Sequence, residues 1–238
     1  MDNDLDVLII GAGPSGCVAA SHLIKKNFNI KVVEKAIFPR FVIGESFLPH
    51  CMDHFDEVGL LDSLKSQNFA IKNGVRFIND GKISNFLFND NYTEGWQWTW
   101  QVPRADFDNI LANELINKGV DIKFNNEVIG VEFDNYGVST TTIVDEKNNT
   151  HKIKAKYIID SSGFGRVLPR LLNLDKTPEL TNYSTIFSHI KISNNINYNN
   201  TSIYIVDDLW AWVIPFSNGI TSVGFSGRSD CFEDYGQL

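Results

Sequence analysis

The residues best placed to bind a ligand stand near the start of the chain. Gly11-Ala12-Gly13-Pro14-Ser15-Gly16 fits the spacing G-x-G-x-x-G and directly follows the apolar run Leu5 to Ile10. In a strand, turn and helix of this kind, Gly11 allows the tight turn and Gly13 lets the backbone approach a pyrophosphate. Gly16 lets the helix pack closely on the strand, and the free N–H groups at the helix N-terminus attract phosphate.

One acid completes this pattern. Glu34 ends a second apolar run, residues 30–33, and comes eighteen residues after Gly16, close to the roughly 20 residues expected for an acid that binds a ribose hydroxyl. A carboxylate there favours an adenosine ribose without a 2′-phosphate. Strand, glycine turn, helix, strand and acid together predict a dinucleotide site, to which we expect Pro14, Ser15 and Lys35 to belong.

Polar residues in the next loop are further candidates for cofactor contact. Residues 38–49 contain two prolines and Gly44, which discourage regular structure. Apolar side chains flank Arg40, Glu45 and Ser46, an unusual mixture for a simple connection. Two interpretations are open: the loop lies against a cofactor, or it is a structural loop held by an ion pair between Arg40 and Glu45.

Two later segments also suggest ligand contact. Arg104 stands at the start of an expected helix, where a cation has the unfavourable sign for the helix dipole, so we expect an anion nearby. The apolar run 155–160 ends at Asp160 and leads into Ser161-Ser162-Gly163. A second glycine-containing loop after a buried strand is a natural second cofactor contact at the carboxyl end of a sheet.

Composition limits the remaining possibilities. The chain has 238 residues, of which 43% are hydrophobic and 21% charged, as in ordinary globular proteins. A net charge of -8 and the lack of a basic run exclude nucleic acid as an expected partner. The sequence contains no apolar stretch of the roughly 18 residues needed to span a membrane, and its start lacks the features of a signal peptide. We therefore expect a cytoplasmic protein.

Cysteines and histidines give no metal or disulfide pattern. The three cysteines are far apart and form neither a disulfide framework nor a C-x-x-C pair. His50 and His54 have the spacing of one helix face, but the sequence suggests no third ligand, so we expect no metal site.

Trp96, Trp98 and Trp100 alternate in the sequence, which predicts three indoles on one face of a strand. These indoles would form either a wall of the core or the wall of an aromatic cavity.

The hydrophobic pattern predicts an α/β protein, a Rossmann-like fold followed by an antiparallel sheet. We expect a cofactor-binding domain at 1–175 and a substrate domain at 176–238, with residues of about 73–100 pairing with the second sheet. The chain ends while that sheet is being built, so we expect a C-terminally incomplete domain. The expected helices are 50–66 and 104–118. The expected strands are 69–78, 82–88, 120–124, 127–133, 138–144, 151–153 and 155–160, then 183–192, 201–206, 209–216 and 220–227 between Asn-rich turns.

An ordered set of motifs resembles the FAD-dependent monooxygenase and flavin-dependent halogenase superfamily. It comprises Glu34, Phe38-Pro39-Arg40-Phe41-x-x-Gly44-Glu45-Ser46, Pro103-Arg104-Ala105-Asp106-Phe107-Asp108 and Asp160-Ser161-Ser162-Gly163. The resemblance implies that FAD is the cofactor. It also implies that the glycine turn and Glu34 hold its ADP half, and that Arg40, Glu45 and Ser46 lie near the flavin. Arg104 would reach the cofactor from its helix, and Asp160 to Gly163 would form a second FAD loop.

Two features resemble the halogenase branch in particular. Trp210-Ala211-Trp212-Val213-Ile214-Pro215 fits the motif W-x-W-x-I-P, although residues 98–103 nearly fit it too. Lys72, in Phe69-x-x-Lys72-x-Gly74, resembles the lysine with which halogenases handle hypohalous acid; the alternative is a solvated lysine at a strand end.

The resulting hypothesis is an FAD-dependent oxidoreductase, a monooxygenase or halogenase, with Lys72 as its catalytic residue. It would act on a small, aromatic substrate that lies against Trp98, Trp100, Trp210 and Trp212. A separate flavin reductase is one possible electron source. The alternatives are a flavin-dependent reductase resembling the geranylgeranyl-reductase branch, and a truncated, inactive flavoprotein, because members of the superfamily continue well beyond position 238.

Overall fold

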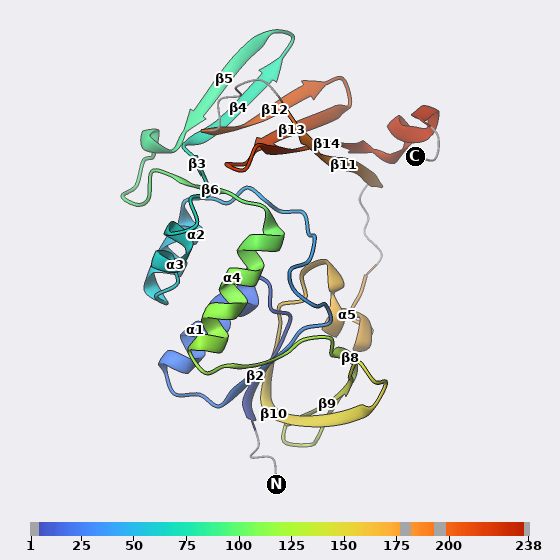
Figure 1. Ribbon diagram of the computed structural model, residues 1–238. Helices are drawn as coiled ribbons and strands as arrows, with labels where there is room; N and C mark the ends of the chain where they lie inside the picture. The colour runs from blue at the N-terminus through green and yellow to red at the C-terminus, as the bar shows by residue number, and fades with distance from the viewer. Residues whose placement is uncertain (1–4, 177–181, 193–198, 236–238) are drawn as a thin grey trace. The chain divides into compact units, whose positions relative to one another are not determined.

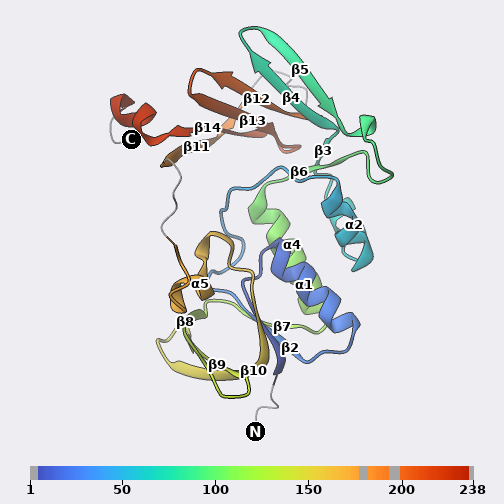
Figure 2. The same cartoon turned by 180° about the vertical axis from the view of Figure 1, so that it is seen from behind.

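The computed structural model describes residues 5–176, 182–192 and 199–235. The chain forms two compact units (Figures 1 and 2). The first comprises residues 1–42, 55–64 and 104–177, and the second residues 43–54, 65–103 and 178–238. Residues 177–181, and residues 193–198 between the expected strands 183–192 and 201–206, lie outside the described residues.

The first unit is built on a six-stranded sheet in the order β7-β2-β1-β10-β9-β8. Its strands are β1 (Leu5–Ile10), β2 (Ile30–Val33), β7 (Asp121–Lys123), β8 (Glu127–Phe133), β9 (Ser139–Val144) and β10 (Thr150–Asp160). β10 is one long strand rather than the two predicted. Its first half pairs with β9 antiparallel and its second half pairs with β1 in parallel. This change of partner lets β10 serve both a β-meander and the Rossmann-like core.

Helices cover both faces of this sheet. α1 (Pro14–Lys25) and α4 (Arg104–Asn117) pack side by side, as both views of the ribbon show (Figures 1 and 2). The short α5 (Val167–Leu171) covers the opposite face, where Leu8 and Ile10 of β1 join a buried cluster with Val128 of β8. The buried apolar side chains of β1 thus anchor the strand on which the glycine turn is mounted.

The second unit is a six-stranded sheet in the order β11-β14-β13-β12-β4-β5. Its strands are β4 (Gly74–Asn79), β5 (Lys82–Leu87), β11 (Tyr183–Lys191), β12 (Asn200–Val206), β13 (Leu209–Pro215) and β14 (Ile220–Arg228). Every pair is antiparallel except β12 with β4. Asp80 and Gly81 both have positive φ, of 47° and 74°, which confirms the primed hairpin turn predicted between β4 and β5. The α/β fold with an antiparallel second sheet is confirmed.

Three local predictions were wrong. The expected helix 50–66 is divided into α2 (His50–Glu57) and α3 (Leu61–Lys65), because Gly59 takes a left-handed φ of 67°. The expected strand 69–78 is two strands, since β3 (Ala70–Lys72) leaves the large sheet to pair with β6 (Thr99–Gln101). β6 includes Trp100 but neither Trp96 nor Trp98, so the three indoles do not share one strand.

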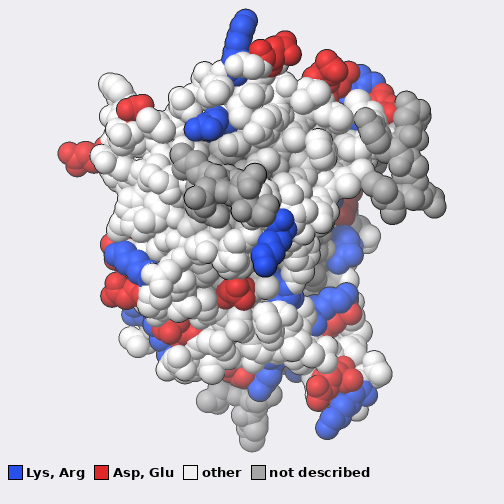
Figure 3. Space-filling model, turned by 45° about the horizontal axis from the view of Figure 1, so that its top comes forward, with Lys and Arg blue, Asp and Glu red and all other residues white. Residues whose placement is uncertain are grey.

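The sheet of the second unit exposes apolar side chains. Phe77, Ile205 and Trp210 each keep about two fifths of their surface accessible, and Phe225 keeps half. In Figure 3 the upper part of the visible face is mostly uncharged, with only scattered charged side chains. Among the described residues, none of the helices has both the length and the apolar character needed to cross a membrane.

Candidate functional site

The glycine turn joins β1 to α1 in the geometry that the motif predicts. Gly11 has a φ of +100°, and a Cβ there would lie 2.5 Å from the carbonyl oxygen of Ser161. A Cβ on Gly16 would lie 2.0 Å from the carbonyl oxygen of Gly11. A Cβ on Gly13, by contrast, would meet only guanidinium nitrogens, at ordinary contact distances. Gly11 and Gly16 are therefore required by the fold itself, whereas Gly13 leaves space at the end of the helix.

Two arginines face that space. Nη2 of Arg40 would be 3.5 Å and Nη2 of Arg104 3.9 Å from a Cβ on Gly13. Both guanidinium groups contact the carboxylate of Asp108, which is fully buried on α4. Arg104 binds it through two hydrogen bonds, of 2.7 Å and 2.9 Å, and Nη1 of Arg40 lies 3.2 Å from Oδ2. Asp108 is thus the nearby anion expected beside Arg104. Two guanidinium groups therefore converge on one buried carboxylate at this place.

Glu34 lies beside the same turn and is buried. Its Oε2 accepts a hydrogen bond of 2.8 Å from the backbone N–H of Ala12, and its Oε1 accepts one of 2.9 Å from Ala36. Nε of Arg40 lies 3.9 Å from Oε1. A carboxylate oxygen can accept more than one hydrogen bond, so Glu34 retains the capacity to bind ribose hydroxyls that the sequence predicts.

These residues fit a dinucleotide pyrophosphate. The N-cap of α1 is Gly13, which offers no side-chain cap, and the first helical turn has no acid. Nη1 of Arg40 is buried beside Asp108, whereas Nη2 of Arg40 and Nη2 of Arg104 lie next to Gly13. Free helix N–H groups with guanidinium groups beside them are what a diphosphate requires. FAD, the cofactor, would be held here by the glycine turn, Arg40, Arg104 and Glu34.

Other predicted cofactor residues have different surroundings. Asp160 ends β10 and holds the following loop, because it accepts hydrogen bonds from the backbone N–H groups of Ser162 and Leu168, at 2.9 Å and 2.8 Å. Gly163, in that loop, has a φ of +58° and open space beside it. Lys35 is exposed and forms an ion pair of 2.7 Å with Glu127. Pro14 is half-buried and Ser15 is exposed at the start of α1.

In the second unit, Glu45 and Ser46 are anchored by long-range hydrogen bonds. Oε1 of Glu45 lies 2.6 Å from Nε2 of His189 on β11, while its Oε2 is buried without a hydrogen-bond partner among the described residues. The hydroxyl of Ser46 contacts that of Thr201 on β12 at 2.8 Å. Glu45 thus pairs with a histidine, not with Arg40 as the structural interpretation of the loop expected.

Gln101 extends this network. Its Oε1 accepts a hydrogen bond of 2.8 Å from Thr201, and its Nε2 donates one of 3.0 Å to the carbonyl of Pro215. Pro215 ends the motif W-x-W-x-I-P, and Gln101 lies within its near copy at 98–103. The two copies of the motif are therefore joined through one buried amide, which also fixes the loop carrying Ser46.

Lys72 is buried at the end of β3, with 3% of its surface exposed. Its Nζ donates a hydrogen bond of 2.9 Å to the carbonyl of Phe47 and lies 5.1 Å from the centre of the Phe88 ring. Burial lowers the pKa of this amine from 10.5 to about 8, because a cation loses solvation among apolar groups. The interpretation of Lys72 as a solvated lysine at a strand end is therefore wrong.

The four tryptophans predicted to bind substrate form two pairs. The rings of Trp98 and Trp100 are 5.3 Å apart, and those of Trp210 and Trp212 are 5.7 Å apart. Trp100 and Trp212 are buried, and the indole N–H of Trp212 donates a hydrogen bond of 3.0 Å to Ser222. Trp210 is 41% exposed and lines a groove with apolar neighbours that include Phe77, Ile203 and Ile205.

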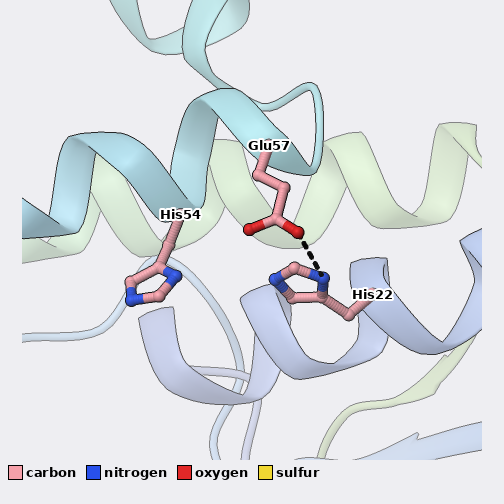
Figure 4. Close-up of side chains that lie close together, drawn as sticks. All are labelled: His22, His54 and Glu57. Carbon is pink, nitrogen blue, oxygen red and sulfur yellow. Dashed lines mark ion pairs between the residues drawn. The ribbon is translucent and has the colours of Figure 1, made fainter.

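One histidine and one acid of the first unit also lie close together. Nδ1 of His22 on α1 lies 3.9 Å from Oε1 of Glu57 on α2, and Figure 4 shows these two side chains together with His54. His54 stands one turn before Glu57 on the same helix, and its ring is 4.8 Å from that of His50. The pair His22 and Glu57 by itself provides two ligands, fewer than the three or four protein ligands of zinc sites.

Several residues of these clusters were not predicted. Asp108 has a sequence signal, because it stands four residues after Arg104 in a helix and such residues face each other. His189, Thr201 and Gln101 have none, because their partners are at least 100 residues away in the sequence.

Comparisons with known proteins agree with this geometry. A family model described as an FAD binding domain matches residues 4–208. A curated relative, the 1H-pyrrole-2-carbonyl-[peptidyl-carrier protein] chlorinase of Pseudomonas fluorescens, is 30% identical over 94% of this chain and 56% of its own length. The chain therefore spans little more than half the length of this relative.

Solved structures show the same fold. A flavoprotein/dehydrogenase from Cytophaga hutchinsonii is 47% identical, with a TM-score of 0.94 over 98% of this chain and 58% of its own. The flavin-dependent halogenase CmlS, at 24% identity, has a TM-score of 0.88 over 99% of this chain and 44% of its own. At that identity the second match supports the fold alone.

Proposed function

The chain belongs to the FAD binding domain family, and we propose that it is the FAD-binding and lysine-bearing part of a flavin-dependent halogenase. When bound, FAD supplies the oxidising chemistry that converts halide into hypohalous acid. The glycine turn, Arg40, Arg104 and Glu34 hold the cofactor. Lys72 receives the oxidised halogen and delivers it to an electron-rich aromatic ring.

The observation that carries this proposal is the burial of Lys72. A lysine with 3% of its surface exposed and a pKa near 8 has an appreciable neutral fraction at neutral pH, and a neutral amine is the nucleophile that reacts with hypohalous acid. An ordinary strand-end lysine stays hydrated and protonated. The motif around Lys72 and the chlorinase among the relatives point in the same direction.

An aromatic substrate is supported by two observations. Trp210, Phe77 and Ile205 line a groove on the sheet of the second unit, and aromatic walls of this kind bind flat rings. The chlorinase of Pseudomonas fluorescens is named for a pyrrole ring carried on a peptidyl carrier protein. We propose a pyrrole or a similarly electron-rich ring as the substrate, and a separate flavin reductase as the source of electrons.

The test supplies the protein with FAD, a flavin reductase, NADH, bromide or chloride, and a set of pyrroles, phenols and indoles. Halogenated product, detected by mass, should form with wild type and be lost in Lys72→Ala, while FAD affinity stays unchanged. Lys82→Ala, at an exposed position at the start of β5, is the matched control and should keep full activity. Product formation at the wild-type rate in Lys72→Ala would refute the role of this lysine.

A second candidate, a flavin-dependent dehydrogenase, is favoured by the 47% identity to the Cytophaga hutchinsonii flavoprotein/dehydrogenase. Such an enzyme would bleach the flavin absorbance on addition of an organic substrate without O2 and halide. Anaerobic bleaching by substrate, with no halogenated product in air, would replace the halogenase proposal.

A further inference from the structure

The buried face of the small sheet formed by β3 and β6 carries three polar side chains. In this antiparallel pair Lys72 is directly opposite Thr99, and Ala70 is opposite Gln101. Directly opposed residues project from the same face, with Cβ atoms about 5 Å apart. Lys72, Thr99 and Gln101 are all buried, with exposures of 3%, 0% and 0%. Polar groups at such depth normally have hydrogen-bond partners.

The three side chains differ in how many of their hydrogen-bond donors and acceptors have partners. Gln101 uses both ends of its amide, on Thr201 and on Pro215. Lys72 donates one hydrogen bond, to the carbonyl of Phe47, although an ammonium group has three donors. The hydroxyl of Thr99 has no hydrogen-bond partner among the described residues.

The same buried face thus carries an incompletely bonded amine and a hydroxyl without a hydrogen-bond partner among the described residues, two groups that a small polar molecule can satisfy. The ring of Phe88 lies 5.1 Å from the amine and adds an apolar wall. A molecule that fits must be small, must accept a hydrogen bond from the amine and must bond with a hydroxyl. Hypohalous acid meets all three conditions, because its oxygen both donates and accepts.

We propose that Thr99 is a second catalytic residue of the Lys72 site, whose hydroxyl hydrogen-bonds hypohalous acid and holds it against the lysine amine. This inference rests on the proposed function and adds a residue to it. In the step it assists, the amine nitrogen attacks chlorine, so that an N–Cl bond forms and the O–Cl bond breaks. The released hydroxide takes a proton from the amine and leaves as water. The hydroxyl of Thr99 bonds to that oxygen as it leaves.

The test uses Thr99→Val, which removes the hydroxyl and keeps the shape, and Thr99→Ser, which keeps the hydroxyl. The control is Thr141→Val on β9, since Thr141 is also fully buried with an unbonded hydroxyl but belongs to the first unit. Because neither hydroxyl has a protein partner to lose, both valine variants should unfold at or above the wild-type temperature. A loss of function in Thr99→Val would then not arise from misfolding.

Two functional measurements follow. In the first, the protein with its three free cysteines replaced by alanine is treated with hypochlorous acid, and chloramine is determined by oxidation of thionitrobenzoate, with the value for Lys72→Leu in the same cysteine-free background subtracted. In the second, halogenated product is measured with bound FAD. Thr99→Val should lower both signals about tenfold, the effect of losing one hydrogen bond. Thr99→Ser and Thr141→Val should stay within about threefold of wild type.

The outcomes separate this inference from the proposed function. Wild-type levels of Lys72 chloramine in Thr99→Val would overturn the role of Thr99, even if halogenated product forms. A Lys72 chloramine that depends on Thr99, in a protein that halogenates no substrate, would support Thr99 while refuting the halogenase proposal. A melting temperature that falls in Thr99→Val but not in Thr141→Val would assign Thr99 a structural role and overturn the inference.

Discussion

Replacing Lys72 by methionine removes the amine but keeps an unbranched side chain in the same buried position. Burial lowers the pKa of Lys72 from 10.5 to about 8, which corresponds to a cost of about 3 kcal/mol for holding the cation in the folded state. The lost hydrogen bond to Phe47 offsets about 1 kcal/mol of that gain. We therefore expect Lys72→Met to be more stable than wild type by about 2 kcal/mol at pH 7.

The pH dependence has a defined sign. Between pH 8 and 10.5 the unfolded chain holds a proton on this lysine that the folded chain has lost, so wild-type stability rises with pH across that window. Below pH 8 both states are protonated and the folded state bears the full cost of the buried cation. Lys72→Met should lack the rise, and its advantage over wild type should disappear as pH approaches 10.5.

Urea unfolding of both proteins at several pH values between 7 and 10.5 measures this difference. Lys82→Met, which removes an exposed lysine, should change stability by less than about 0.5 kcal/mol at every pH. Acetic anhydride labelling against pH gives the amine pKa independently. A Lys72→Met protein less stable than wild type at pH 7, with a labelling pKa near 10.5, would show that the buried amine is well solvated and would refute the reasoning.

Four further substitutions test the rest of the site. Gly13→Ala should leave the melting temperature unchanged, because the added Cβ meets no backbone atom, but it should abolish tight FAD binding, because the Cβ occupies the space before the end of the helix. Gly16→Ala places a Cβ 2.0 Å from a carbonyl oxygen and should lower the free energy of unfolding by about 1–3 kcal/mol, measured by thermal unfolding. Glu34→Gln should weaken FAD about ten- to a hundredfold in a fluorescence titration, through the loss of charged hydrogen bonds, and equal affinity would remove Glu34 from the site. Gln101→Leu should destabilise the protein by about 2–4 kcal/mol in urea, since it removes the amide donor of the Pro215 carbonyl and the acceptor of the Thr201 hydroxyl, and a neutral result would show that water replaces the amide.

The sequence was most informative where one local pattern determines the structure. The glycine turn, β1, β2 and Glu34 form a contiguous unit of thirty residues (5–34) whose spacing alone specifies its geometry. The strands of the second sheet other than β4 could be predicted within one or two residues, because alternating hydrophobicity marks each of them. The primed turn at Asp80 and Gly81 is a similar local signal.

Predictions failed where distant chain segments decide the structure. Residues 69–78 read as one strand, yet β3 and β4 belong to different sheets, since β3 finds its partner in β6 and β4 in β12. The partner of Glu45 is His189, 144 residues away, and no pattern around either residue indicates this pairing. The burial of Lys72 and Thr99 likewise results from tertiary packing, so the sequence could only suggest the lysine through a family motif.

The position of β10 beside β1 in the first sheet determines how late in translation this sheet can be completed. β1 lies between β2 and β10, and Leu5 pairs with Ala155 while Asp6 binds Lys156 at 2.7 Å. During synthesis, about 150 further residues must therefore be translated after β1 before β10 leaves the ribosome and can pair with it. Closing so long a loop between the two strands is slow. Ser161, whose carbonyl oxygen lies next to Gly11, is translated later still. FAD consequently finds a complete binding turn only after more than 160 residues have been translated, and it cannot assist the earlier steps of folding.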